Sequence, residues 1–197
     1  MQSAAWICAI LAAMPVLASE RITVSICIRG RLDDKLVAGA ESAASALFRA
    51  ADIDVTWAQC EIGLEGDDAL EQHWYTVRLR NGRPFIPAAP AMHDTLGEAF
   101  TSIDAPGYIA EVYYEAVQSL AYGQQIDVSR LMGYALAHEL GHLVLGPRHA
   151  PLGLMRGGWN MNDLAAMRQG CLKFTPAEGQ RMRDLLHATV RRAATAP

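Results

Sequence analysis

The residues with the clearest chemical pattern are His138, Glu139 and His142. Two histidines four positions apart lie one turn apart on an α-helix, about 6 Å along its axis, so their imidazoles can converge on one ion. Glu139 lies beside them, close enough to hold a metal-bound water without being a ligand itself. The three residues therefore predict a divalent metal site on a helix.

The helix that carries this pattern is expected at residues 128–145. Asp127 is a good N-cap, while Gly146 can adopt the left-handed conformation that ends a helix and Pro147 cannot continue one. Apolar or small residues occupy nearly every side of the segment, which is typical of a buried helix. Burying two imidazoles and a carboxylate is costly unless something satisfies them. A metal ion does so; the alternative is a trio of buried side chains that hydrogen-bond without metal.

A third ligand is predicted at His149, because the chain must turn back after Pro147. A catalytic zinc takes three protein ligands and keeps one position open for water, and three neutral imidazoles satisfy that requirement. The alternative third ligands are Asp163 and Glu178, although Glu178 also completes a capping box, Thr175-Pro-Ala-Glu178, that opens the last helix. A second tight turn is expected near Gly153.

The string H138-E-L-G-H142-L-V-L-G146-P-R-H149, followed by Met155, resembles the metzincin clan of zinc metalloproteases. Its three residues between the second histidine and the glycine resemble the spacing of archaemetzincins. The chain is also similar to uncharacterised exported bacterial proteins with an HELGH helix. The resemblance implies a zinc metalloendopeptidase with one Zn²⁺ held by the three histidines and with a peptide or protein substrate.

The same resemblance assigns two further roles. Glu139 would be the general base that assists a zinc-bound water in hydrolysing a peptide bond, and Met155 would be the Met-turn residue beneath the metal. Two features of related families are not expected here. Archaemetzincins have a downstream cysteine cluster for a second zinc, whereas only Cys171 follows the motif in this chain, and Gly157 occupies the position at which some metzincins have a tyrosine ligand.

The elements that must position the site follow from periodicity. Strands are expected at 21–29, 53–57, 74–80, 95–100 and 108–114, and helices at 34–51, 116–122, 128–145 and from about 176 onward. A strand–helix–strand start predicts a parallel pair with a crossover helix. The fold class is α+β and zincin-like: a mixed, mostly parallel twisted sheet with an edge strand at 95–100, a buried active-site helix and a small helical C-terminal subdomain. Residues 19–146 would form the N-terminal subdomain and residues 147–197 the C-terminal one.

Residues 1–18 are interpreted as a signal peptide. The run from Ser3 to Ala18 is apolar and uncharged, is short for a membrane span, and ends in small residues at the positions that a signal peptidase reads. The chain would then be exported to the periplasm or beyond, with a mature start near Ser19 and no later segment able to span a bilayer. An uncleaved N-terminal anchor is the alternative.

Export implies an oxidising compartment, in which one disulfide and one free thiol account for the three remaining cysteines. The pair Cys27–Cys60 is favoured because both lie near predicted strands, and Cys60–Cys171 is the alternative.

Composition limits the other functions. The 197 residues are 51% hydrophobic and 19% charged, which is enough for a folded core, and the formal net charge is −4. An acidic chain with scattered arginines is not expected to bind nucleic acid. Apart from the protease, the sequence allows an exported zinc-binding or interaction protein without peptidase activity. Retention of Glu139, which zinc binding alone does not require, favours the enzyme.

Overall fold

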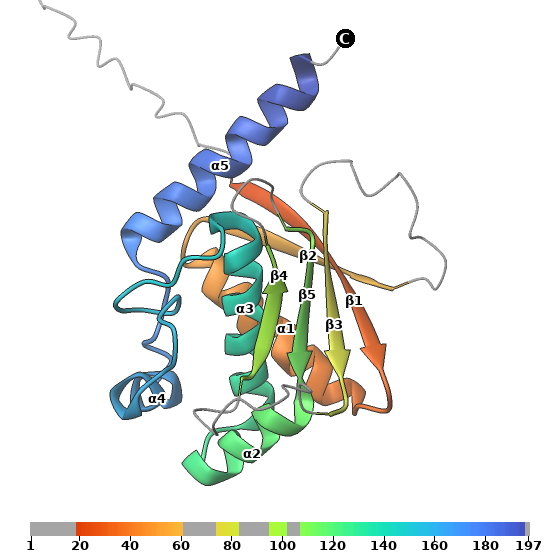
Figure 1. Cartoon of the computed structure of the whole chain (residues 1–197), viewed down its shortest axis with the longest axis vertical. Coiled ribbons are helices and arrows are strands. Elements are labelled where there is room, and N and C mark those ends of the chain that lie inside the picture. The colour runs from red at the N-terminus through yellow and green to blue at the C-terminus, as the bar shows by residue number, and fades with distance from the viewer. Residues whose placement is uncertain (1–18, 61–73, 83–94, 102–106, 196–197) are drawn as a thin grey trace, which may run out of the picture.

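A five-stranded sheet forms the centre of the molecule in the computed structural model, which describes residues 19–60, 74–82, 95–101 and 107–195 (Figure 1). Its order is β2-β1-β3-β5-β4, and all neighbours are parallel except the edge strand β4, which runs antiparallel to β5. The strands are β1 (Glu20–Arg29), β2 (Ile53–Gln59), β3 (Trp74–Arg80), β4 (Gly97–Phe100) and β5 (Ile109–Tyr113). The predicted signal peptide, residues 1–18, lies outside the described residues.

Two helices cover one face of this sheet. α1 (Asp34–Arg49) connects the parallel strands β1 and β2, as the strand–helix–strand pattern predicts, and α3 (Val128–Leu145) packs against α1 and the β5–β4 end of the sheet (Figure 1). Alternate residues of β1, such as Ile22, Val24 and Ile26, are buried in the same core as both helices. The core therefore holds α3 firmly against the edge strand.

Small residues bring α1 and α3 close together. A Cβ atom added at Gly133 would lie 2.5 Å from Cβ of Ala43 and 2.7 Å from the carbonyl oxygen of Ala40, and one added at Gly39 would lie 2.8 Å from Oγ of Ser129. A larger side chain at either glycine would force the helices apart. The close approach of α1 and α3 therefore depends on a glycine in each helix, Gly39 in α1 and Gly133 in α3.

Three further helices complete the described chain. α2 (Tyr114–Gln124) precedes the buried helix, and α4 (Met161–Arg168) and α5 (Pro176–Thr195) follow it. The predicted capping box opens α5, because the amide of Thr175 donates to Glu178 Oε2 and the amide of Glu178 donates to Thr175 Oγ1. In the part of the chain that the structure describes, no helix is long and apolar enough to cross a membrane.

The α+β class is confirmed, together with the mostly parallel sheet, the crossover helix, the edge strand and the buried helix at 128–145. Two details of the prediction are wrong. The sequence predicts only the helix from about residue 176 after Met155, whereas the structure also has α4 there. α2 begins two residues before the predicted 116. The division into subdomains at residue 146 stays a prediction.

Cys27 and Cys60 form a disulfide, and Cys171 is an exposed free thiol, so the structure contains the favoured pairing and not the Cys60–Cys171 alternative. Cys27 alternates with the buried Ile26 and therefore faces the side of the sheet opposite α1 and α3. The amide of Cys60 also donates to the carbonyl of Ile26. The crosslink thus fixes the residue that follows β2 to the C-terminal part of β1.

Candidate metal centre

α3 begins and ends where the sequence predicts. The side chain of Asp127 accepts from the amide of Arg130 at 2.9 Å, and the amide of Gly146 donates to the carbonyl of His142. Gly146 has a φ of 94° and a ψ of −177°, a combination that glycine adopts readily but that lies outside the left-handed helical region, so the helix ends at this glycine without the expected left-handed cap. Within the helix His138, Glu139 and His142 are only 9%, 6% and 6% exposed.

The two helix histidines are held in one orientation by backbone carbonyls. Nδ1 of His138 donates to the carbonyl of Leu154 at 2.8 Å, and Nδ1 of His142 donates to the carbonyl of Gly146 at 3.0 Å. A carbonyl can only accept, so the proton of each neutral ring is on Nδ1 and the lone pair is on Nε2. This is the arrangement by which the outer hydrogen bond of a ligating histidine fixes its tautomer.

The two Nε2 atoms face each other at 3.1 Å. Two nitrogen lone pairs at this distance repel each other unless both point at a shared cation. Two nitrogen ligands that each lie 2.0–2.1 Å from a tetrahedral zinc ion are expected to be about 3.3 Å apart. The donor set and its spacing therefore fit a zinc ion. The metal-free alternative needs a proton on one of the two Nε2 atoms for a direct hydrogen bond between the rings, and the choice between it and a bound ion stays a prediction.

Burial keeps both rings neutral. It lowers the pKa of His138 from 6.5 to about 4, with a further lowering by His142 and His149 and an opposing contribution from the bond to Leu154. Burial likewise lowers the pKa of His142, again with a contribution from His149. Neutral imidazole is the form that binds metal, so the pair is ready to bind at neutral pH.

The loop after α3 brings His149 to the same point. Its ring centroid lies 4.7 Å from that of His142 and 5.4 Å from that of His138, and the ligand atoms of the three residues all lie within 4.8 Å of one another. Among the described residues this is the one group of three potential ligands that could share an ion. His149 is exposed, whereas the other two are buried, so the site is open to solvent on the side of His149.

Gly157 makes room for the ring of His149. A Cβ atom added there would lie 2.8 Å from Cγ and 2.9 Å from Nδ1 of that ring. The turn that returns the chain is closed by bonds from the amide of Ala150 to the carbonyl of Met155 and from the amide of Arg156 to the carbonyl of Gly153. The predicted tight turn at Gly153 is present, with φ at 79°.

Met155 packs against α3 at Gly141, the residue before His142. It is 1% exposed, and a Cβ atom added at Gly141, which precedes His142 in α3, would lie 2.5 Å from its sulfur and 3.1 Å from its methyl group. Phe174 approaches the same point at 3.1 Å. Met155 therefore packs against α3 next to His142, and its role as a Met-turn residue stays a prediction.

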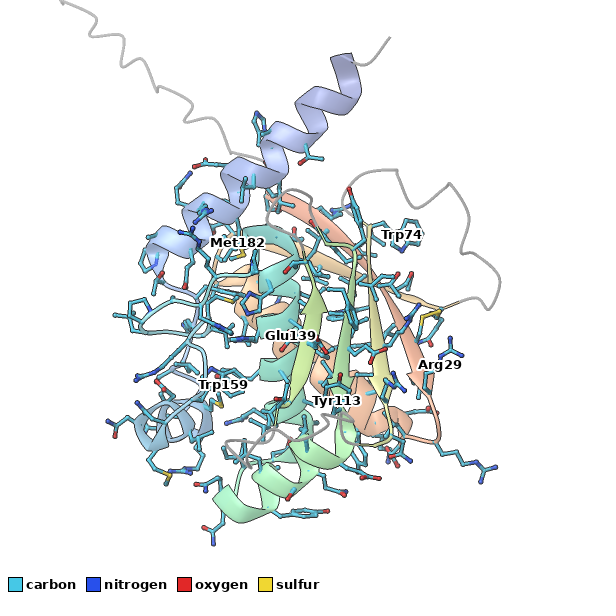
Figure 2. All side chains as sticks on the ribbon, viewed as in Figure 1. Arg29, Trp74, Tyr113, Glu139, Trp159 and Met182 are labelled. Atoms are coloured by element: carbon cyan, nitrogen blue, oxygen red, sulfur yellow. A yellow bond between two sulfur atoms is a disulfide. The ribbon has the colours of Figure 1, made fainter. Side chains whose placement is uncertain are left out.

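Glu139 faces the edge strand rather than the loop (Figure 2). Its carboxylate accepts from the amide of Ala99, and a Cβ atom added at Gly97 would lie 2.7 Å from Cγ and 2.9 Å from Oε1 of Glu139. Burial raises the pKa of Glu139 to about 8; the negative charge of Glu98 raises it further, and the bond from Ala99 opposes both. A buried carboxyl with a pKa near neutrality can both take and return a proton.

The alternative third ligands are used elsewhere. Asp163 accepts from the amide of Asn160 at 2.9 Å in a capping box at the start of α4, and it pairs with Arg156 at 3.6 Å. Glu178 caps α5. Among the other histidines, His187 lies 3.4 Å from Glu20 on the surface, and His73 and His93 lie outside the described residues.

Two residues near the site were missed by sequence reasoning. Gly97 admits the Glu139 carboxyl, and Trp159 donates from Nε1 to the carbonyl of Leu154 at 3.0 Å, the same oxygen that holds His138. The sequence did hold a signal for Trp159, because it directly follows Gly157-Gly158 and lies close to Met155. A large aromatic side chain after a glycine pair needs a packing partner.

No family model and no curated protein matches the chain. Among solved structures it is similar to archaemetzincin from Methanopyrus kandleri, with a TM-score of 0.48 and 16% sequence identity over 88% of this chain and 98% of that one. Any chemistry assigned to the site therefore rests on its own residues and distances.

Proposed function

We propose that this chain is a zinc-dependent metallopeptidase in which His138, His142 and His149 are the metal ligands and Glu139 is the general base. The observation that carries the proposal is the pair of Nε2 atoms 3.1 Å apart, with both Nδ1 atoms already committed to backbone carbonyls. His149 supplies a third imidazole and leaves a fourth, solvent-facing side for water and substrate. Three protein ligands with one open position are typical of catalytic rather than structural zinc.

Each residue would then have a separate task. A bound zinc ion supplies acidification of water and polarisation of a carbonyl group. Glu139 would accept the proton released from the attacking water and pass it to the leaving amine. Burial under β4 raises the pKa of Glu139 in the metal-free protein, and the positive charge of a bound cation nearby would favour the ionised carboxylate that this task requires. Met155 would support the two helix histidines from below through Gly141.

The edge strand offers a place for an extended peptide. The amide of Tyr113 donates to the carbonyl of Leu96, and such pairs alternate along an antiparallel ladder, so the backbone groups of Gly97 and Ala99 point away from β5. A substrate strand that pairs with this side of β4 would pass Glu139, whose carboxylate already accepts from the amide of Ala99. The scissile bond would thereby be placed between the edge strand and the histidines.

Export is a separate part of the proposal. Residues 1–18 would be removed as a signal peptide, and the Cys27–Cys60 disulfide suits an oxidising compartment. N-terminal sequencing of the protein recovered from the periplasm or medium tests this directly. A start near Ser19 supports cleavage, whereas a start at Met1 overturns it.

The test of the metal site compares zinc content and peptide hydrolysis across four variants. We expect about one zinc per wild-type chain and for His187→Ala, a matched surface control, and loss of zinc in His138→Ala and His142→Ala. Glu139→Gln should keep zinc and lose at least 10²-fold in turnover of a peptide library, on the order of a general-base contribution. Hydrolysis by the wild type should stop with a chelator and return with zinc.

The outcomes separate the candidate functions. A zinc-free wild type overturns the metal site. A wild type that binds zinc but cleaves no peptide favours the exported zinc-binding protein over the peptidase. Full activity of Glu139→Gln would contradict the role of Glu139 as general base.

A further inference from the structure

Trp159 lies at the metal site although no role has been assigned to it. It follows Gly158, whose φ of 88° turns the chain, and precedes Asn160, the N-cap of α4. Its side chain is half-buried between α3 and α4 (Figure 2). The residue is therefore held at a fixed point, with the helix on one side and the turn on the other.

Trp159 and His138 share one hydrogen-bond acceptor. The carbonyl of Leu154 accepts from Nδ1 of His138 at 2.8 Å and from Nε1 of Trp159 at 3.0 Å. Leu154 is fully buried, and its amide donates to the carbonyl of Lys173 at 2.9 Å. The peptide groups on both sides of Leu154 are thus bonded, and the two lone pairs of its carbonyl are assigned to two rings.

The two rings also contact each other. Their centroids are 5.5 Å apart and their planes are at 88°, which is a favourable edge-to-face arrangement. The indole therefore borders the imidazole on one side. Trp159 therefore restricts His138 in two ways, through the acceptor and through the ring.

We infer that Trp159 is a positioning residue for His138: it fixes the Leu154 carbonyl and the imidazole so that Nε2 points at the other two histidines. The inference rests on the proposed zinc site. Without the indole N–H, the carbonyl keeps one donor and can tilt, and the imidazole gains freedom that zinc binding must then remove. Outer partners of ligating histidines contribute about 10- to 100-fold to metal affinity.

The test is the substitution Trp159→Phe, which keeps an aromatic ring and removes the N–H. Trp57→Phe is the matched control, because Nε1 of Trp57 donates to Oγ of Ser45 at 2.8 Å in β2, away from the site. Zinc dissociation constants are measured by competition with a chromophoric chelator. We expect Trp159→Phe to bind zinc about tenfold more weakly than the wild type and Trp57→Phe to bind it within about twofold.

A second measurement does not depend on zinc. Nitrogen-15 spectra of the imidazoles in metal-free protein report which ring nitrogen carries the proton. We expect the wild type and Trp57→Phe to show His138 protonated on Nδ1, and Trp159→Phe to show a shifted or averaged signal. Thermal unfolding of the metal-free variants identifies any general loss of folding, which would change all imidazole signals rather than that of His138.

The failures are distinguishable. Equal zinc affinities for the two tryptophan variants, with an unchanged His138 signal, overturn the role of Trp159 while leaving the zinc site intact. A wild type that binds no zinc overturns the proposed function, and the imidazole spectra still decide whether Trp159 orients His138.

Discussion

The ring of His149 depends on the absence of a side chain at Gly157. The added Cβ atom of an alanine there would lie 2.8 Å from Cγ of the imidazole, and the ring would have to move. Ligand atoms must lie within about 0.2 Å of their ideal distances from zinc, so a small displacement is costly. We expect Gly157→Ala to weaken zinc binding by about tenfold or more, as measured by chelator competition.

The control for this substitution is Gly123→Ala in α2, where an added Cβ atom meets nothing within 4 Å. That variant should bind zinc as the wild type does and gain about 0.5–1 kcal/mol in stability from helix propensity. Wild-type zinc affinity in Gly157→Ala would show that His149 is not held against the glycine, or that it is not a ligand.

Glu139 makes the stability of the metal-free protein depend on pH. Burial raises its pKa in the folded state from 4.5 to about 8. Between these values the unfolded chain has released a proton that the folded chain keeps, so this residue lowers the free energy of unfolding as pH rises. Glutamine cannot titrate. The gain in Tm of Glu139→Gln over the wild type, both in chelator, should therefore increase from pH 5 to pH 8.

His138 changes the free energy of unfolding with pH in the opposite direction. Its pKa in the folded state is lowered to about 4, so its contribution to stability is lost as the pH falls below 6.5. The contribution is common to both proteins and cancels in the difference. Glu115→Gln, an exposed exchange in α2, is the matched control. A difference in Tm between Glu139→Gln and the wild type that is the same at all pH values would contradict the buried, protonated state of Glu139.

At the scale of single residues, sequence spacing was sufficient for the three histidines and Glu139 to be singled out, and the structure brings the histidines together. Gly97 and Trp159 could not be found in the same way. Their partners, Glu139 and Leu154, lie far away along the chain or across a turn whose path depends on Gly153 and Gly158. Such contacts depend on tertiary structure that no local spacing encodes.

At the scale of elements, α3 was predictable because both of its ends carry strong signals, Asp127 at the start and Gly146-Pro147 at the end. α4 was missed because it has only 8 residues, of which Leu164 and Met167 are buried, so there is no long apolar stripe to detect. Its start was readable, since Asn160 and Asp163 form a capping box.

α4 also helps to explain why the loop after α3 is well defined. A guanidinium N–H of Arg130, in the first turn of α3, donates to the carbonyl of Arg168 at 2.6 Å, and Arg168 donates to the carbonyl of Gln124 at 3.0 Å. The end of α4 is thereby attached to the junction of α2 and α3. The segment between residues 146 and 160, which carries His149 and Met155, therefore runs from the end of α3 to the start of α4, whose far end is bonded back to the first turn of α3.

At the scale of the whole molecule, the parallel pairing of β1 and β2 followed from the order of elements, because a strand–helix–strand unit permits little else. The full order β2-β1-β3-β5-β4 did not, since β3 pairs with β1 on the side away from β2, and sequence order alone does not choose that side. The side of β1 on which β3 adds depends on which face of the sheet the helices cover, and this is decided only when the core assembles.

The disulfide stabilises this arrangement from the face opposite the metal site. It joins residues separated by 33 positions, for which loop closure in the unfolded chain is worth about 3–4 kcal/mol. We expect the double substitution Cys27→Ser and Cys60→Ser to lower Tm by roughly 10 °C in calorimetry while leaving zinc stoichiometry unchanged.

Cys171→Ser is the control, because this thiol is exposed and unpaired with another cysteine. It should change neither Tm nor zinc content. A large loss of zinc in the double variant would mean that the two faces of the sheet are not independent.

The unequal exposure of the three histidines has a kinetic consequence. His138 and His142 are closed off by the protein, whereas His149 faces water on a loop. If the three bind one ion as proposed, exchange takes place from the outer side: the loop imidazole is the last to attach and the first to release, and the buried pair retains the ion in the meantime. The lifetime of the bound metal would then be set by how often a short loop opens, and not by how tightly the helix holds its share.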